Sequence, residues 1–354
     1  MEYLTGAWKM VIEMVRTGMM SVILSLGLAA SASALQGDGT SEPGWNAAGR
    51  LEEGRAGLGV AVLDGKLYAA GGSGLTTPHV EFDQYDPDYD DWIPELSLPV
   101  GLERFGMAAI EGRIYVAGGY AGGGYTPEET GFQPYGQTRQ AYSAPTSPSA
   151  SMWSWSPEDG IWQSEAALPG PRVDFDLISL NERLYAIGGQ RDDETLYVFD
   201  PVETSWSSES LPAGVIRQGA VSVVFAGELW VMGGMTDGDV TRRTDVFSPQ
   251  SGEWRTGPDL PEAVVGASAA SFQGRLHLMG GRGSDNETTL DTHWAYDGER
   301  AVWERVGTLL APRTEAAAAV VGDGIYLVGG GSGGGFFAPF TALNDTDVYT
   351  ELAE

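Results

Sequence analysis

Two adjacent glycines recur six times along this chain, at intervals of 47, 70, 45, 47 and 49 residues. A ring-bearing side chain (Tyr, Trp or His) stands three residues before each doublet, and the first five repeats carry an aromatic residue followed seven positions later by tryptophan. A period of this length indicates a repeat architecture, in which each unit buries its apolar face only against its neighbours. The doublets are Gly71-Gly72, Gly118-Gly119, Gly188-Gly189, Gly233-Gly234, Gly280-Gly281 and Gly329-Gly330.

Each unit has the pattern of four short strands joined by polar turns. In the first unit, residues 57–63, 66–72 and 79–85 have strand character, Asp64-Gly65 is a hairpin turn signal, and Trp92 opens a fourth strand. Four strands in about 45–50 residues indicate a propeller blade. The doublet, the ring before it and the spaced aromatic/tryptophan pair resemble the kelch repeat, whereas a WD-type repeat lacks support because no Trp-Asp dipeptide occurs.

The kelch resemblance spans residues 45–349 and implies an all-β fold, a six-bladed β-propeller with four antiparallel strands per blade. The sixth repeat is incomplete: its third strand ends at Tyr349, and the expected tryptophan would fall beyond the last residue. Trp45 stands ten residues before Arg55, as Trp162 stands ten before Arg172. We therefore expect the N-terminal strand to close the last blade, which gives one domain over 45–354 with an inserted loop at about 120–152 in blade 2.

Residues 1–34 have the features of a secretory signal peptide. A short apolar run at 17–30 follows Arg16, and Ala32-Ser33-Ala34 is a small-residue cleavage signal. The alternative is an N-terminal anchor helix, although the run is short for a bilayer span. We predict an exported, periplasmic or extracellular protein, with a short linker at 35–44, a monomeric state and no transmembrane segment after processing.

Charge and composition exclude several functions. The formal net charge is −29 and the chain has no cysteine. Such an acidic surface repels nucleic-acid phosphates and anionic membranes. Some kelch-type propellers are copper-radical sugar oxidases, but that resemblance implies a cofactor made from a cysteine joined to a tyrosine, which this chain cannot form. The three histidines suggest no metal cluster, and we predict no cofactor.

Sixteen residues before the doublets, four of the six equivalent positions are arginine. One interpretation is a positively charged ring near the channel mouth that attracts an anionic ligand. The other is a set of structural ion pairs with neighbouring loops, which is the commoner use of such residues. The six positions are Arg55, Leu102, Arg172, Arg217, Val264 and Arg313.

Two positions further on, three repeats have glycine and three have a charged residue. Arg104, Asp174 and Glu315 come from blades two, three and six, and Asp176 continues the same strand face. They are predicted either to converge on one ligand or to form a hydrated polar plug. Aromatic residues in two long loops are further candidates for ligand contacts: Tyr120 and Tyr125 in the inserted loop, Phe336 and Phe337 in the loop at 331–341.

The residues leave two functional hypotheses open. The first is an exported, non-catalytic module that binds a glycan or a protein through the face carrying the d–a and b–c connections. The second rests on resemblance to exported six-bladed sialic acid epimerases (mutarotases), which use acid–base chemistry without metal. It implies that Arg217 or Arg104 holds a sugar carboxylate while Glu315 or Asp174 moves the proton. The chain has no motif specific to that group.

Overall fold

Six antiparallel sheets of four strands make up most of the part of the chain that the computed structural model describes, residues 44–74, 78–122, 147–189, 195–334 and 341–351. All named elements in these residues are β-strands, so the all-β prediction is confirmed. The residues belong to a unit running from Glu42 to Glu354. The predicted signal peptide and nearly all of the predicted linker lie outside the described residues.

In five sheets the strands follow one another in chain order. Blade 1 contains β2 (Gly59–Leu63), β3 (Lys66–Ala70), β4 (Phe82–Asp86) and β5 (Asp91–Pro94). Blade 2 contains β7 (Gly106–Ile110), β8 (Arg113–Ala117), β11 (Met152–Trp155) and β12 (Trp162–Ser164). Blade 3 contains β13 (Phe175–Leu180), β14 (Arg183–Gly188), β15 (Thr195–Asp200) and β16 (Ser205–Ser210). Blade 4 contains β17 (Val221–Phe225), β18 (Glu228–Met232), β21 (Thr244–Ser248) and β22 (Glu253–Thr256). Blade 5 contains β23 (Ser268–Phe272), β24 (Arg275–Met279), β25 (Thr292–Asp297) and β26 (Val302–Thr308).

The sixth blade joins the two ends of this unit, as predicted. It contains β27 (Ala317–Val321), β28 (Gly324–Val328), β29 (Thr346–Thr350) and, as its outermost strand, β1 (Gly44–Ala48). In the pairing of β1 with β29, Trp45 lies opposite Tyr349. This is the same pairing as Tyr85 opposite Trp92 in blade 1, so Trp45 occupies the predicted tryptophan position.

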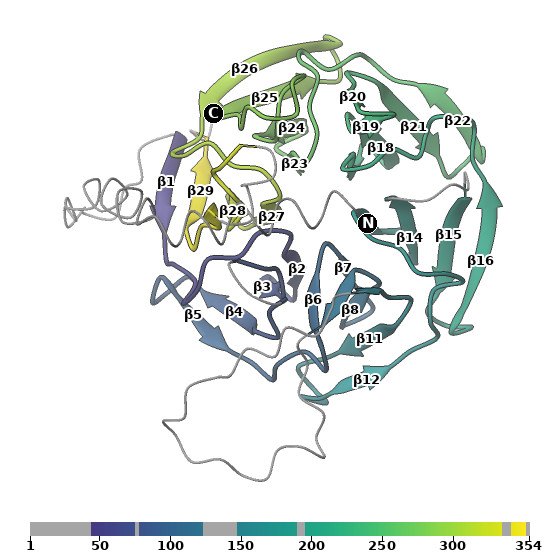
Figure 1. Cartoon of the computed structure of the whole chain (residues 1–354), viewed down its shortest axis with the longest axis vertical. Coiled ribbons are helices and arrows are strands. Elements are labelled where there is room, and N and C mark those ends of the chain that lie inside the picture. The colour runs from purple at the N-terminus through teal and green to yellow at the C-terminus, as the bar shows by residue number, and fades with distance from the viewer. Residues whose placement is uncertain (1–43, 75–77, 123–146, 190–194, 335–340, 352–354) are drawn as a thin grey trace, which may run out of the picture. The chain divides into compact units, whose positions relative to one another are not determined.

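The sheets are arranged around a common centre, with their first strands innermost (Figure 1). The first strand of each blade contacts that of the next, and β27 of blade 6 contacts β2 of blade 1. The ring residue before each doublet packs on the third-strand aromatic of the following blade, with centroids 5.4–6.2 Å apart. This confirms the prediction that these rings pack between blades. The pairs are Tyr68/Trp155, Tyr115/Phe199, Tyr185/Phe247, Trp230/Tyr296, His277/Tyr349 and Tyr326/Tyr85.

The glycine doublets occupy crowded backbone positions at the ends of the second strands. All twelve glycines have φ between +57° and +98°, a region that L side chains rarely adopt. A Cβ on Gly71 would lie 2.5 Å from the Leu102 carbonyl oxygen of the next blade. The second glycine of a doublet donates across the same junction, as in the hydrogen bond from Gly72 N to Leu102 O (2.8 Å). The doublets therefore serve inter-blade packing, as expected.

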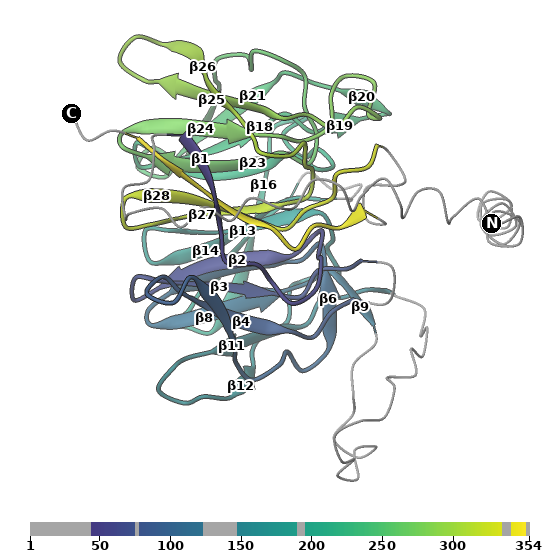
Figure 2. The same cartoon turned by 90° about the vertical axis from the view of Figure 1, so that its left-hand side faces the viewer.

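The b–c connections carry additional short strands on one side of the ring (Figure 2). The sequence predicted only an inserted loop at 120–152, but its two ends pair with each other: β9 (Tyr120–Gly122) lies between β6 (Gly101–Glu103) and β10 (Ser147–Pro148). In blade 4, β19 (Met235–Thr236) pairs with β20 (Asp239–Val240). Among the described residues, no helix is long and apolar enough to cross a membrane.

Candidate functional site

Six equivalent backbone positions surround the channel mouth, where the chain enters the innermost strands. All six have φ between +53° and +65°, so each is in the left-handed region. Five printed hydrogen bonds of 2.7–3.0 Å join neighbouring positions, including Arg104 N to Gly57 O and Gly57 N to Glu315 O. Glycine meets this backbone requirement in three repeats, whereas a charged residue carries it in the other three. The six residues are Gly57, Arg104, Asp174, Gly219, Gly266 and Glu315.

The three charged residues meet, as one of the two sequence interpretations predicted. Arg104 Nη2 donates to both carboxylate oxygens of Glu315 at 3.0 Å, and Arg104 Nη1 lies 3.5 Å from Asp174 Oδ1. The span from blade 2 to blade 6 is possible because Gly57 has no side chain: a Cβ there would lie 2.9 Å from Arg104 Cγ.

Arg282 is a fourth member of this group that the sequence analysis missed. Its Nη1 lies 3.1 Å from Glu315 Oε1, and its Nε donates to Asn286 Oδ1 at 3.1 Å. Arg282 directly follows the fifth glycine doublet, in the b–c connection, which was the available sequence signal. We call Arg104, Asp174, Arg282 and Glu315 the mouth cluster.

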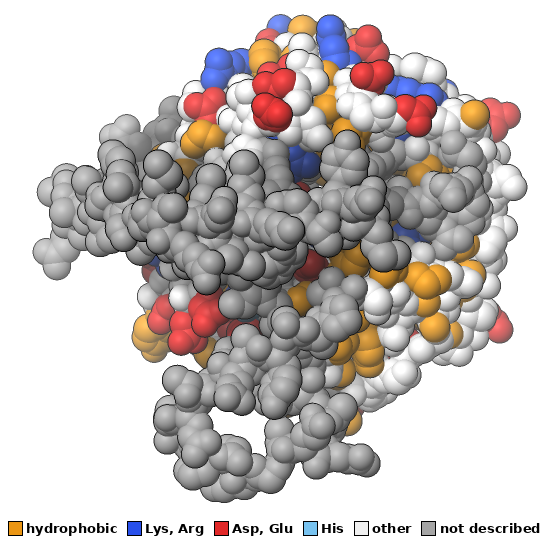
Figure 3. Space-filling model, in the orientation of Figure 1, with side chains coloured by type: hydrophobic (Ala, Val, Ile, Leu, Met, Phe, Trp, Pro, Cys, Tyr) orange, Lys and Arg blue, Asp and Glu red, His pale blue; other side chains and the backbone are white. Residues whose placement is uncertain are grey.

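The mouth cluster is electrically balanced and half-buried. Its side chains are 12–26% exposed, so solvent reaches each of them. Burial lowers the pKa of Arg104, but the Glu315 and Asp174 carboxylates outweigh that effect and hold the pKa above its usual value. Burial raises the pKa of the nearby Tyr120, with Asp174 adding to the rise and Arg104 opposing it. Figure 3 views this face: acidic and basic side chains intermingle along the described part of its upper edge, and both signs appear near its centre.

Asp176 does not join the mouth cluster through any printed contact. Its Oδ2 accepts a hydrogen bond from Ser222 N in blade 4 (2.6 Å), so it bridges two innermost strands. Burial raises its pKa to about 6, although the hydrogen bond from Ser222 opposes the rise.

The predicted arginine ring is not at the channel mouth, which corrects its assignment as a ligand site. Arg55, Arg172, Arg217 and Arg313 are only 1–2% exposed. Arg55, Arg217 and Arg313 lie 2.5–2.6 Å from Asp83, Asp245 and Asp347, respectively. Arg172 instead donates to two backbone carbonyls and lies over the Tyr197 ring, 4.3 Å from its centroid. The alternative interpretation, structural pairing, is the one that the structure supports.

The partners of these arginines follow a rule within the chain. Each partner lies at the same position of the third strand, opposite the residue two before the doublet, as in the pairs Ala69/Asp83 and Leu327/Asp347. The two repeats without arginine have tryptophan there, Trp153 beside Leu102 and Trp294 beside Val264. This joint variation of the two positions was the sequence signal that would have identified the pairs.

Two further expectations concern loops and metals. Tyr125, Phe336 and Phe337 lie outside the described residues. Among the residues with described positions, no group of three His, Asp or Glu side chains is arranged to hold a metal ion. Of the histidines, His277 is fully buried, in agreement with its prediction as a core residue.

Comparisons with known proteins agree with this architecture. Residues 136–330 match the KLHDC2/KLHL20/DRC7 Kelch-repeats domain, and residues 54–95 match the Kelch motif. Kelch-like protein 35 of Mus musculus is 28% identical over 200 residues, covering 56% of this chain and 34% of that protein. Beta-scruin of Limulus polyphemus is 26% identical over 205 residues, covering 53% of this chain and 22% of that protein. The chain thus spans about a third or less of these relatives.

The solved structure of YjhT is similar in fold. It superposes with a TM-score of 0.67 at 16% sequence identity, covering 84% of this chain and 95% of that one. The family match extends over more than half of the chain, and the structure repeats one four-stranded unit around a centre. The chain therefore belongs to the kelch-repeat family of β-propellers.

Proposed function

We propose that this protein is an exported binding module that holds a glycan at the channel mouth through the mouth cluster. The observation that carries the proposal is the left-handed backbone of Arg104, Asp174 and Glu315. A non-glycine residue in this conformation costs about 1–2 kcal/mol, and strain of this kind collects at functional sites. Three glycines fill the equivalent positions, so the fold itself does not require the charges.

The chemistry of the mouth cluster suits a ligand rich in hydroxyl groups. A sugar hydroxyl donates one hydrogen bond and accepts others, and the cluster presents guanidinium donors beside carboxylate acceptors. Two arginines and two acids give no net charge, which removes the reason to expect an anionic ligand. Kelch repeats are typical of protein-binding modules, and a protein partner is therefore the competing outcome of the test.

Replacing Glu315 by glycine tests the proposal without disturbing the fold. We expect the free energy of unfolding to change by about 1 kcal/mol or less, because relief of the left-handed strain offsets the loss of solvent-reached ion pairs. Binding of the glycan identified on an array with the wild-type protein should weaken by at least about tenfold, since a hydrogen-bonded carboxylate is lost. Calorimetric titration and urea unfolding provide the two measurements.

Glu182→Gly is the matched control. Glu182 is also left-handed (φ 61°) but lies in the turn between β13 and β14, at the other end of the innermost strand. This variant should bind the glycan like the wild type. Unchanged affinity in Glu315→Gly would contradict the proposal, and a wild-type protein that binds no glycan but captures a protein through the same residues would replace glycan by protein.

A mutarotase is the second candidate, favoured by two carboxylates on one guanidinium. Asp174 and Glu315 lie 3.5 and 3.0 Å from Arg104, so one could remove and the other deliver a proton while Arg104 orients the sugar. If this holds, the protein accelerates anomer exchange of sialic acid or a common hexose, measured by NMR. Glu315→Gln and Asp174→Asn should each lower the rate by about 100-fold or more. Exchange no faster than in buffer eliminates this candidate.

A further inference from the structure

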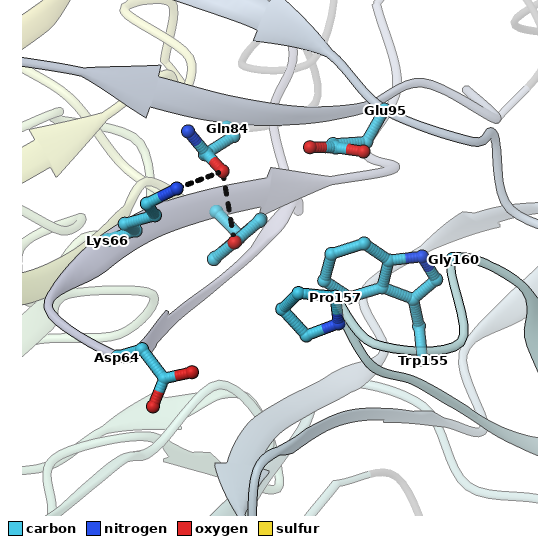
Figure 4. Close-up of a pocket in the computed structure, with 8 residues that line it drawn as sticks. Asp64, Lys66, Gln84, Glu95, Trp155, Pro157 and Gly160 are labelled. Atoms are coloured by element: carbon cyan, nitrogen blue, oxygen red, sulfur yellow. Dashed lines mark hydrogen bonds between the residues drawn. The ribbon is translucent and has the colours of Figure 1, made fainter.

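A shallow pocket lies between blades 1 and 2, at the strand ends opposite the channel mouth. Its volume is about 290 Å³, near the lower end of ligand sites. Figure 4 shows the Glu95 carboxylate and the Trp155 indole at one end of the pocket, and Lys66 and Asp64 at the other. Lys66 Nζ and the Tyr68 hydroxyl both donate to Gln84 Oε1, at 3.3 and 3.1 Å.

Three polar groups of this pocket have no partner in the described part of the chain. The carboxylates of Asp64 and Glu95 form no ion pair or side-chain hydrogen bond there. Trp155 is 2% exposed, and its Nε1–H has no acceptor. A buried donor without an acceptor is costly, about 1–3 kcal/mol. A ligand that brings both donors and an acceptor would satisfy all three groups.

Comparison with blade 2 shows that the unpaired glutamate is specific to this pocket. Glu165 stands three residues after Trp162, as Glu95 stands three after Trp92. Glu165 Oε1 accepts a hydrogen bond from Ser154 Oγ at 2.6 Å, whereas Gln84, at the position of Ser154, is engaged by Lys66 and Tyr68. Blade 1 therefore leaves its carboxylate available to a ligand.

The surroundings of the pocket fit a protein surface. Leu96 and Ile161 adjoin the pocket residues Glu95 and Gly160 in sequence and are 51% and 53% exposed. They are close in space, because Trp162 Nε1 donates to the Leu96 carbonyl oxygen at 2.9 Å. A second cavity of about 370 Å³ shares Asp64 with the first and adds Glu111 and Glu158. An acidic groove beside exposed apolar side chains is complementary to a basic segment with apolar neighbours.

We propose that this pocket, which we call the blade 1–2 pocket, binds an arginine side chain of a partner protein. The guanidinium group has five planar donors that can reach both Glu95 and Asp64, and its charge complements the excess of one carboxylate over Lys66. The partner's main-chain carbonyl supplies the acceptor for Trp155 Nε1–H. Leu96 and Ile161 cover the apolar residues that flank the arginine.

The test uses the indole N–H of Trp155 as its reporter. The whole protein, labelled with ¹⁵N, is titrated with the peptide acetyl-Leu-Arg-Leu-amide, and Trp155→Phe assigns the indole signal. Phenylalanine already fills this position in blades 3 and 4, at Phe199 and Phe247, so the variant should fold. We expect the Trp155 Nε1–H signal to shift and saturate, with a Kd below about 1 mM.

Three comparisons decide the result. Glu95→Gln should weaken binding at least about tenfold, whereas Glu165→Gln, the equivalent change in blade 2, should leave it within about twofold. The same peptide with citrulline, which is uncharged and nearly the same shape, should bind at least about tenfold more weakly. Equal binding of the two peptides, an inert Glu95→Gln, or no shift of the Trp155 signal at about 10 mM peptide would overturn the proposal. Glu315→Gly should have no effect, which separates this pocket from the mouth cluster.

Discussion

Acidification from pH 6.5 to pH 4 is expected to lower the free energy of unfolding by roughly 6 kcal/mol through two buried histidines. Burial lowers the pKa of His277 to about 4, and Arg275 adds to that effect. Burial lowers the pKa of His293 to about 3, with contributions from His277 and Arg275. Unfolded histidine binds a proton below about pH 6.5, whereas the folded protein takes up these protons only near pH 4 and pH 3. Stability is therefore full above pH 6.5 and falls throughout this window.

The histidines matter because they connect blade 5 to the closing strand β1. Trp45 Nε1 donates to His293 Nδ1 at 3.1 Å, and His293 Nε2 lies 2.9 Å from His277 Nδ1. Indole N–H is a donor only, so His293 accepts on Nδ1, carries its proton on Nε2 and donates to His277. Protonation of His293 Nδ1 would place a proton against the Trp45 N–H. Acid should consequently loosen β1 first.

Urea unfolding at several pH values measures this effect, and hydrogen exchange locates it. The control is His277→Tyr with His293→Phe, because repeats one, two, three and six have tyrosine at the first position and repeat one has Phe82 at the second. The difference in stability between wild type and this double variant removes the contribution of the many carboxylates. A difference that does not change between pH 6.5 and pH 4 would contradict the expectation.

Replacement of Asp347 by alanine should destabilise the protein by about 3–5 kcal/mol, because it leaves the Arg313 guanidinium buried without its counter-charge. The Arg313 and Asp347 side chains are 1% and 3% exposed, and their atoms Nη2 and Oδ2 lie 2.5 Å apart. After the substitution, the one side-chain hydrogen bond printed for Arg313 would be a long one, 3.4 Å to the Gly329 carbonyl oxygen. Urea unfolding at pH 7 gives the measurement.

The chain itself offers a compensating variant. Blade 2 replaces the ion pair by Leu102 and Trp153, which belong to one apolar cluster. Arg313→Leu combined with Asp347→Trp should therefore regain at least half of the lost stability, since a well-packed apolar pair can replace a buried ion pair at little cost. If Asp347→Ala is as stable as the wild type, the pair is not needed to compensate a buried charge.

The strands, the inter-blade rings and the closure by Trp45 were predictable because the repeat shows each of them several times. Asp64-Gly65, for example, has φ of 52° and 74°, as the hairpin turn signal requires. The position of Arg55 was not predictable from one strand, because its side chain is directed by Asp83, 28 residues further on. The site was only partly predictable for the same reason.

Arg104, Asp174 and Glu315 were recognised because they depart from glycine at a repeated position. Arg282 was missed because it lies in a connection whose length and sequence differ between blades, so no repeated position marks it. The blade 1–2 pocket was missed because it depends on what Glu95 lacks. That lack appears only when the contacts of Glu95 are compared with those of Glu165.

The closure of blade 6 also sets an order of events during synthesis. Trp45 leaves the ribosome early, yet its partners lie 248 residues further on at His293 and still later at Tyr349. Closing a loop of this length costs roughly 5 kcal/mol of chain entropy, which is regained only when the last strand arrives. Until then β1 is a strand without its neighbour, open to pairing with other chains. The same contact that completes the ring makes its absence the period of greatest risk for aggregation.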